Sequence, residues 1–266
     1  MKKLTALSLV LILVLSVLSG CSGDTVENNI IRIGVTPEPH SKLVDLVKDD
    51  LEAKGITLEV IEFTDYVKPN LALADGELDA NFFQHQPYLD DFSEAEGLDL
   101  VSIGNVHVEP MALYSNKAGS VEELKDGSEI AIPNDTVNGG RALILLENNG
   151  LITLKEGAGL EATENDIAEN PHNFVFTALE AAALPRVLEE VDAAVINGNF
   201  ALQANLNPIN DGILIEGENS PYANIVVVRA GEESEDKYQK LIEALQSEEI
   251  KTFIEENYEG GVVPAF

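Results

Sequence analysis

The stretch IIRIGVTPEPHSKLVDLVKDDLEAKGITLEVIEF, residues 30–63, decides the fold class. Its two ends, Ile30–Val35 and residues 57–63, are apolar and rich in β-branched side chains, which is typical of strands. Between them, apolar residues at helical spacing predict a helix over residues 40–54 that stops at Gly55. A strand, a helix and a second strand in succession predict an α/β unit, because parallel strands need such a crossover.

The alternation of strand and helix continues along the rest of the chain. Further strands are predicted at residues 80–83, 109–114, 130–132, 192–196 and 225–228, and further helices at 68–75, 87–96, 137–149 and 234–256. This order of elements predicts an α/β protein with mostly parallel sheets.

The length and the last helix together suggest two lobes. A chain of 266 residues, at roughly 150 residues per domain, is long enough for two domains. A long final helix after a late strand suggests that the chain returns to its first domain. We therefore expect one lobe of residues 30–110 plus 225–266 and a second lobe of residues 111–224, with crossings near Pro110 and Pro221. A cleft between two such lobes is a common place for a small-molecule site.

The N-terminus resembles a lipoprotein export signal. A basic start precedes an apolar run at residues 4–18, which is shorter than the ~20 residues of a membrane-spanning helix. The run ends in LSGC, which resembles a bacterial lipobox, and Cys21 is the only cysteine of the chain. We expect residues 1–20 to be a signal peptide, Cys21 to be lipidated, and residues 21–29 to be a tether. The protein would then be anchored by lipid on the extracytoplasmic face of the cell membrane. The alternatives are an ordinary signal peptide with an incidental cysteine, or an N-terminal membrane anchor.

The charge excludes several classes of partner. The chain has 16 Lys and Arg against 47 Asp and Glu, a formal charge of −31. Polyphosphate and anionic lipid headgroups repel such a protein, so we expect neither nucleic-acid binding nor electrostatic binding to a membrane.

The sequence offers no positive case for catalysis. Its four histidines, His40, His85, His107 and His172, include no pair at a metal-ligand spacing such as i, i+4. Nucleophile-elbow, dinucleotide-binding and Walker-A patterns are absent from the sequence. We therefore expect no enzyme activity, no metal and no cofactor, and we keep a lipid-anchored enzyme acting on amino-acid derivatives as the alternative from another class. A third class, a surface adhesin or structural lipoprotein, would have a ligand-indifferent cleft.

Two segments are better suited to binding than to catalysis. Arg141 is the only cation between Lys125 and Lys155, and it follows two glycines near the start of a predicted helix. Free N–H groups, close approach and one guanidinium make a carboxylate-sized anion site. The alternative is that Arg141 pairs with a surface carboxylate.

The segment FFQHQPY, residues 82–88, places four rings within seven residues. One of Phe82 and Phe83 is expected in the core, because adjacent residues of a strand point to opposite faces. The other, with His85 and Tyr88, would line an apolar slot with polar edges.

Two asparagines stand at predicted strand ends. Asn197 follows a buried strand and Asn224 precedes one, so either can face a ligand at the edge of a sheet. Each alone is more often a turn residue.

At these residues the chain resembles the methionine-binding lipoproteins of the NlpA family, the substrate-capture subunits of methionine ABC importers. The strings that carry the resemblance are IGVTP (33–37), FTDYVKPN (63–70), DANFFQHQPYL (79–89), IPND (132–135), GRAL (140–143), LPR (184–186), AVIN (194–197) and SPYAN (220–224). The resemblance implies a two-lobed type II periplasmic-binding-protein fold that closes on one amino acid. It also implies that Tyr66, Phe83, His85 and Tyr88 surround the thioether side chain, that Arg141 holds the α-carboxylate, and that Asn197 and Asn224 hold the backbone polar groups.

The resemblance implies a monomer that captures L-methionine and delivers it to an ABC permease and its ATPase. The alternatives are D-methionine, a methionine-containing dipeptide or another small amino acid. Two segments depart from the family pattern. Glu38 stands in EPH where Gly-Pro-His is usual, and residues 136–140 differ from the commoner Pro-Thr-Asn-x-Gly. The second departure flanks Arg141, which leaves the geometry of the carboxylate site and the identity of the ligand open.

Overall fold

The computed structural model describes residues 29–217 and 220–266. The expected signal peptide, Cys21 and all but the last residue of the expected tether lie outside these described residues. In the described part of the chain, no helix is both long and apolar enough to span a membrane.

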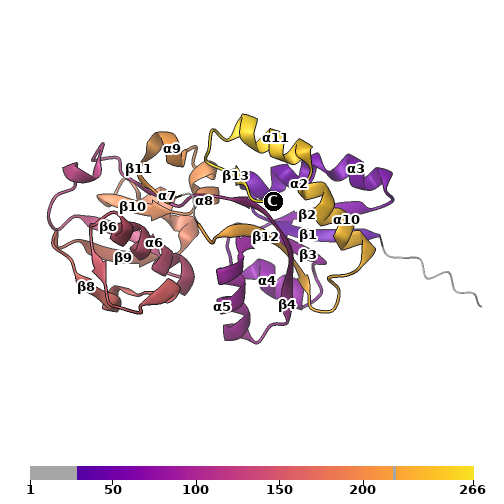
Figure 1. Cartoon of the computed structure of the whole chain (residues 1–266), viewed down its shortest axis with the longest axis horizontal. Coiled ribbons are helices and arrows are strands. Elements are labelled where there is room, and N and C mark those ends of the chain that lie inside the picture. Colours follow the sequence, from indigo (N-terminus) through magenta and orange to yellow (C-terminus); the bar gives the residue numbers. More distant parts are fainter. Residues whose placement is uncertain (1–28, 218–219) are drawn as a thin grey trace, which may run out of the picture.

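The described chain forms two large mixed sheets, and each sheet belongs to its own half of the molecule (Figure 1). In spatial order, the first consists of β13 (Val263–Pro264), β4 (Leu100–Val108), β12 (Ala223–Arg229), β3 (Ala80–His85), β1 (Ile30–Val35) and β2 (Thr57–Glu62). The second consists of β11 (Gly212–Ile215), β5 (Ala112–Tyr114), β10 (Ala193–Ile196), β6 (Glu129–Pro133) and β9 (Val175–Leu179). A small hairpin of β7 (Thr153–Leu154) and β8 (Ile167–Glu169) is attached to the second half.

The prediction of mostly parallel sheets is wrong. In the two large sheets of the described chain, β1 is parallel to β2 and β3, and β6 is parallel to β9 and β10. The strands β12, β13, β5 and β11 are antiparallel to their neighbours. The reason is that strands arrive in each sheet from the other half of the molecule: β5 enters the second sheet after β4, and the chain returns to the first sheet at β12. β12 arrives after β11 and lies between β3 and β4, where no crossover helix constrains its direction.

The helices cover both sheets. They are α2 (Lys42–Leu46), α3 (Lys48–Ala53), α4 (Lys68–Ala74), α5 (Gln86–Glu96), α6 (Thr136–Asn148), α7 (Leu184–Val187), α8 (Gly198–Gln203), α9 (Pro208–Asp211), α10 (Asp236–Leu245) and α11 (Glu248–Asn257). Short turns of helix precede or separate them at η1 (Pro37–Ser41), η2 (Val121–Glu123), η3 (Gly159–Glu161), η4 (Glu164–Asp166) and η5 (Ala181–Ala183).

Two predicted helices are interrupted, and one predicted strand is shifted. Residues 40–54 form α2 and α3 with a break at Val47, whose N–H bonds Val44 three residues back. Residues 234–256 form α10 and α11, because the Ser247 hydroxyl caps a new helix by accepting from the N–H of Ile250. The strand predicted at residues 109–114 begins only at Ala112, and β4 was not predicted, because its polar residues and Gly104 hide the strand pattern.

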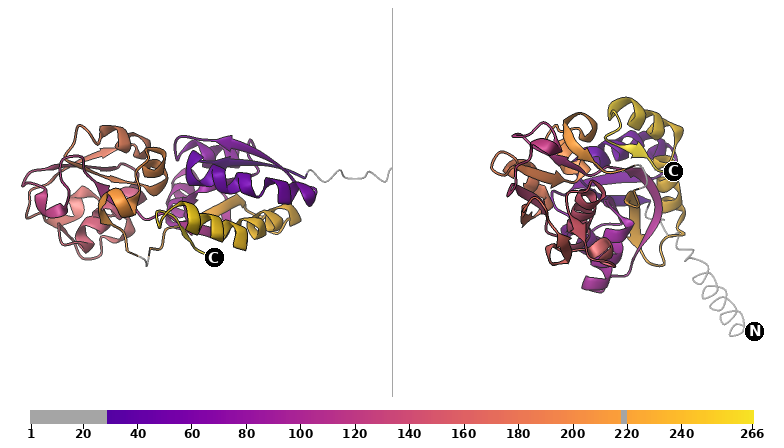
Figure 2. Two further views of the ribbon diagram at one scale, coloured as in Figure 1. Left: turned by 90° about the horizontal axis from the view of Figure 1, so that it is seen from above. Right: turned by 60° about the vertical axis from the view of Figure 1, so that its left-hand side comes forward.

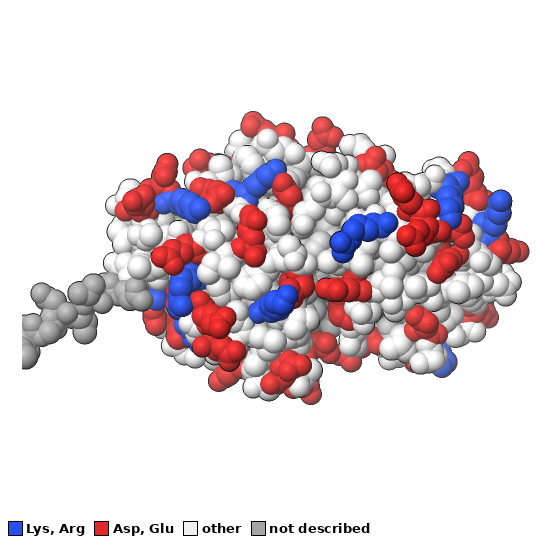
Figure 3. Space-filling view, turned by 180° about the vertical axis from the view of Figure 1, so that it is seen from behind, with Lys and Arg blue, Asp and Glu red and all other residues white. Residues whose placement is uncertain are grey.

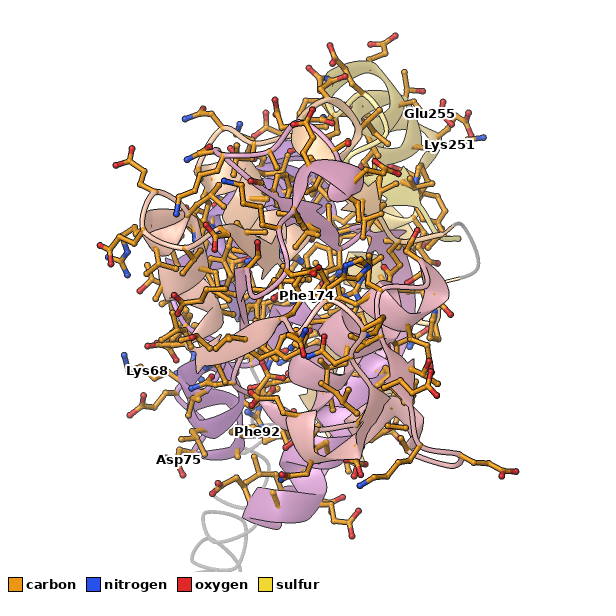
Figure 4. All side chains as sticks on the ribbon, turned by 90° about the vertical axis from the view of Figure 1, so that its left-hand side faces the viewer. Lys68, Asp75, Phe92, Phe174, Lys251 and Glu255 are labelled. Atoms are coloured by element: carbon orange, nitrogen blue, oxygen red, sulfur yellow. The ribbon has the colours of Figure 1, made fainter. Side chains whose placement is uncertain are left out.

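The late helices complete the core of the first half. A cluster of buried apolar residues joins β1 to the early and late helices, with Leu43, Leu51, Leu241 and Ile254 all without exposed surface. Figure 2 shows the yellow α10 and α11 beside the indigo α2 and α3, as the contacts between α10 and α3 require. The second half has its own core between its sheet and α6. Figure 4 shows Phe174 inside this half, whereas Lys251 and Glu255 project outward from α11.

The acidic surplus lies on the surface. Figure 3 shows Asp and Glu side chains spread over the visible face, with few Lys and Arg among them. Several of the lysines pair with a carboxylate one helical turn away, as Lys54 does with Asp50 at 2.8 Å. Such exposed pairs contribute at most about 1 kcal/mol each, so most of the acidic charge is simply solvated.

Candidate ligand-binding site

A cavity lies between the two sheets, at the edge where β3 and β12 face α6 and α8. All seven side chains that the sequence singled out for the ligand line it: Tyr66, Phe83, His85, Tyr88, Arg141, Asn197 and Asn224. Five residues that it did not single out line the cavity as well: Gln84, Glu109, Asn138, Gly198 and Asn199. The cavity therefore draws on both halves of the molecule.

Aromatic rings form one wall of the cavity. The ring of Tyr66 lies with its centroid 5.9 Å from those of Phe83 and Tyr88, and 4.9 Å from that of Phe200. These rings meet edge-on or tilted, as their quadrupoles favour. A polarizable, apolar group such as a thioether fits such a wall.

A bulge in β3 separates the two phenylalanines. The pairing with β12 runs from Gln84 directly to Phe82, so that Phe83 has no opposite residue. Phe82 is fully buried in the core of the first half, and Phe83 faces the cavity. The prediction that one of the two belongs to the core is confirmed. The extra residue in the bulge changes the direction in which the side chains after it point.

His85 is neutral and has one defined tautomer. Its Nδ1 accepts from the N–H of Tyr88 at the start of α5, at 3.3 Å, so the proton lies on Nε2. Nε2 then donates to Asn138 Oδ1 at 3.2 Å. Burial lowers the pKa of His85 to about 3, and the positive charge of Arg141 acts in the same direction.

Arg141 both lines the cavity and pairs with a carboxylate. Its Nε and Nη2 donate to Glu216 at 2.8 and 2.5 Å, and Nη2 also donates to the Glu109 carbonyl at 3.0 Å. The ring of Tyr222 lies 4.2 Å from the guanidinium carbon. In the described part of the chain, no hydrogen bond occupies Nη1. The guanidinium is thus fixed along one edge, and Nη1 is left for another anion.

Two asparagine side chains, those of Asn197 and Asn199, each have one amide atom that is hydrogen-bonded and one that is not, among the described residues. Asn197 Nδ2 donates to Asn138 Oδ1 at 2.8 Å, and Tyr66 donates to Asn199 Oδ1 at 2.5 Å. Asn197 Oδ1 and Asn199 Nδ2 are buried without a partner among the residues that the structure describes. The cavity wall therefore carries one unused acceptor and one unused donor, which is costly unless a ligand pairs with them.

A cluster of buried titratable groups adjoins the cavity. Glu109 Oε1 accepts from His107 Nε2 at 2.7 Å and lies 3.4 Å from His40 Nε2, which also contacts Asn224 Oδ1 at 3.0 Å. Burial lowers the pKa of His40 to about 4 and that of His107 to about 3, and burial raises the pKa of Glu109. Gly198 permits this packing, because a Cβ there would lie 2.6 Å from the Cβ of Glu109.

The same cluster is the one place in residues 29–217 and 220–266 where three groups that can ligate a metal lie within 4.8 Å of one another. Its Nε2 atoms are already engaged in hydrogen bonds to Glu109 and Asn224. His107 Nδ1 has no partner among the described residues, whereas a metal-bound imidazole needs one to orient it. The arrangement is that of a hydrogen-bonded cluster.

Comparison with known proteins identifies the family. The sequence model of the family described as NlpA lipoprotein matches residues 31–266. The chain belongs to this family.

Other NlpA-related proteins share its length and fold. D-methionine-binding lipoprotein MetQ of Salmonella typhimurium is 43% identical over 249 residues, 92% of each chain. A nutrient-binding protein from Burkholderia cenocepacia, solved bound to methionine, is 47% identical with a TM-score of 0.86, over 89% of this chain and 100% of that one. An ABC transporter periplasmic substrate-binding protein from Coxiella burnetii is 43% identical with a TM-score of 0.85, over 88% and 100%. The predicted two-lobed type II periplasmic-binding-protein fold is confirmed.

The residues that sequence reasoning missed had weak signals. Asn199 stands two residues after Asn197, and Asn138 lies within the glycine-containing segment before Arg141. Glu109 was only the first residue of the strand predicted at 109–114, next to the predicted crossing near Pro110. Polar residues of this kind are abundant at turns, so their position in the chain did not distinguish a cavity wall from an ordinary loop.

Proposed function

We propose that this protein is an extracytoplasmic solute-binding lipoprotein that captures methionine and delivers it to an ABC importer. The observation that carries the proposal is the pair of unused polar atoms beside Arg141: a buried acceptor, Asn197 Oδ1, and a buried donor, Asn199 Nδ2. An amino acid supplies the matching groups, since its ammonium donates and its carboxylate accepts. The names of the relatives support the choice of methionine.

Each part of the ligand has a proposed partner in the cavity. The α-carboxylate binds Arg141 Nη1 and Asn199 Nδ2. The ammonium group binds Asn197 Oδ1 and the carboxylate of Glu109, and Asn224 contributes to holding the backbone polar groups. The thioether side chain lies against the wall of Tyr66, Phe83 and Tyr88, with His85 as a neutral edge.

We propose L-methionine as the ligand, with D-methionine, a methionine-containing dipeptide and another small amino acid as alternatives. Titration calorimetry tests this on the detergent-solubilised full-length protein, after unfolding and refolding to remove carried-over ligand. Tight binding of L-methionine supports the proposal, and parallel titrations with the D-isomer and with a dipeptide rank the alternatives. An absence of heat with every methionine derivative overturns it. Mass spectrometry of the ligand that co-purifies with the native protein identifies the physiological one.

The remaining parts of the proposal concern the setting. The two sheets would be the cores of the two lobes, residues 30–110 plus 225–266 and residues 111–224, which close on the ligand. Cys21 would carry the lipid anchor on the outer face of the cell membrane, and the monomer would pass its ligand to a permease driven by an ATPase. The proposed role includes no catalytic step. Turnover of amino-acid amides by the purified protein would instead favour the alternative of a lipid-anchored enzyme.

A further inference from the structure

The geometry points to Asp135 as a positioning residue that decides which end of the Asn197 amide faces the cavity, and thereby the preference of the cavity for a ligand ammonium group. This inference rests on the proposed function, because it assigns a cause to the polarity of that site. Asp135 does not line the cavity. It acts through Asn138.

The first step is the orientation of Asn138. Asp135 is the N-cap of α6, and its Oδ1 accepts from the backbone N–H of Asn138 at 2.9 Å. The same oxygen accepts from Asn138 Nδ2 at 2.8 Å. A backbone N–H can only donate, so this oxygen is an acceptor and the group beside it must be the NH2 of Asn138. Asn138 Oδ1 is thereby directed toward the cavity.

The second step is the orientation of Asn197. Asn138 Oδ1 accepts from Asn197 Nδ2 at 2.8 Å and from His85 Nε2 at 3.2 Å. These three side chains are buried, with Asn138 only 1% exposed, so water cannot substitute for a misdirected group. Asn197 must present its NH2 to Asn138, and its Oδ1 is the end that remains for the cavity.

The result is a chain of three hydrogen-bonded residues with a single sense, running from Asp135 through Asn138 to Asn197. At its far end stands an acceptor, which suits an ammonium group and disfavours a carboxylate or a carbonyl. His85 donates to the same atom of Asn138 and acts in the same sense. Without Asp135, the Asn138 amide loses the partner of its NH2 and is held from one side only.

Two substitutions separate this role from helix capping. Asp135→Ser keeps a good N-cap but is too short to hold the NH2 of Asn138 as well. Asp135→Asn keeps an acceptor oxygen of the same reach and is the conservative rescue. Ser247→Ala, which removes the cap of α11, is the control for loss of a helix cap elsewhere. Should Asp135→Ser not fold, Asp135→Gly gives the same test, because glycine is also tolerated at a cap.

The readout is a ratio of affinities. L-methionine is compared with its 2-hydroxy analogue, whose hydroxyl can pair with either end of the Asn197 amide. Asp135→Ser should weaken L-methionine binding about fivefold or more while the analogue changes by about twofold or less. Asp135→Asn and Ser247→Ala should leave the ratio as it is. Equal weakening of both ligands by Asp135→Ser, or an unchanged ratio, overturns the inference.

A second measurement needs no ligand. The side-chain NH2 of Asn197 should exchange with solvent more quickly in Asp135→Ser than in the unaltered protein, as NMR detects. Unchanged exchange overturns the chain of hydrogen bonds. A protein that binds neither ligand, yet shows the faster exchange, overturns the proposed function and leaves the role of Asp135 standing.

Discussion

Two buried clusters of side-chain amides among the described residues differ in one respect. Asn70, Asn81 and Gln84 bond one another between α4 and β3, with distances of 2.6–3.0 Å, and every amide nitrogen and oxygen among them has a partner. Asn138, Asn197 and Asn199 lie at the cavity, and two of their atoms have none among the described residues. The first cluster is therefore complete by itself.

The difference distinguishes a structural cluster from a binding one. Burying an amide is costly unless its hydrogen bonds are made, so a closed cluster stabilises the fold and an open one awaits a ligand. Four predictions, in decreasing order of expected effect, test whether this distinction holds.

Removing Arg141, the cation that lines the cavity beside the open cluster, should have the largest effect on ligand affinity. Arg141→Ala removes the proposed partner of the ligand carboxylate and leaves Glu216, which is only 14% exposed, without its ion pair. Calorimetry should show a loss of about 2–5 kcal/mol in the binding of L-methionine. Arg186→Ala removes an exposed arginine of the same half and should leave the affinity unchanged. Unaltered affinity in Arg141→Ala would remove Arg141 from the site.

A matched pair of substitutions compares the clusters directly. Asn70→Ala leaves Asn81 and Gln84 with unmade hydrogen bonds, and should lower the free energy of unfolding by about 1–3 kcal/mol while changing the affinity less than the stability. Asn199→Ala should instead weaken ligand binding by about 1–3 kcal/mol with a smaller effect on stability. Chemical denaturation and calorimetry on both variants measure the two quantities. The same profile in both variants would contradict the distinction.

The neutral side chain of His85, which is hydrogen-bonded to Asn138 of the open cluster, should make the free energy of unfolding depend on pH. Burial keeps the pKa of His85 near 3 in the folded protein, whereas the unfolded chain binds a proton below about pH 6.5. The contribution is therefore complete above pH 6.5 and is lost as pH falls toward 3, at up to about 1.4 kcal/mol per pH unit.

The measurement is the free energy of unfolding between pH 7 and pH 5. His85→Gln should reduce the slope by up to one proton. An equal slope in His85→Gln and the unaltered protein would show that His85 is not buried neutral. His40 and His107 add to the slope in the same direction, because burial lowers their pKa values too.

The smallest effect concerns the second amide of the open cluster. Tyr66→Phe removes the donor that holds Asn199 Oδ1 and frees the amide to rotate, which should cost about 0.5–1.5 kcal/mol of affinity. Tyr114→Phe is the control, because the Tyr114 hydroxyl is buried without a partner in the described part of the chain. A larger loss in Tyr114→Phe than in Tyr66→Phe would contradict the role of Tyr66.

Hydrophobic periodicity and end signals along the sequence predicted those helices and strands that depend on neighbouring residues of the chain. The strand at Ile30–Val35 and the helix that carries Arg141 have clear periodicity and end signals, and both are present. The break at Ser247 was not predicted, because apolar residues recur on both sides of it and hide the cap. The direction of β12 was not predictable either, since it depends on strands that lie more than a hundred residues earlier.

The site divides in the same way. By itself, the sequence determined the chemical kinds of group available to a ligand: one guanidinium in an acidic segment, a cluster of rings, and asparagines at strand ends. Only the tertiary structure decided which of these meet, and which atoms they leave free. Asp135 and Asn138 stand at the start of α6 whereas Asn197 stands at the start of α8, and the polarity of their hydrogen bonds arises only once the two helix ends pack together. A hydrogen bond has a direction, and burial without water is what makes that direction consequential.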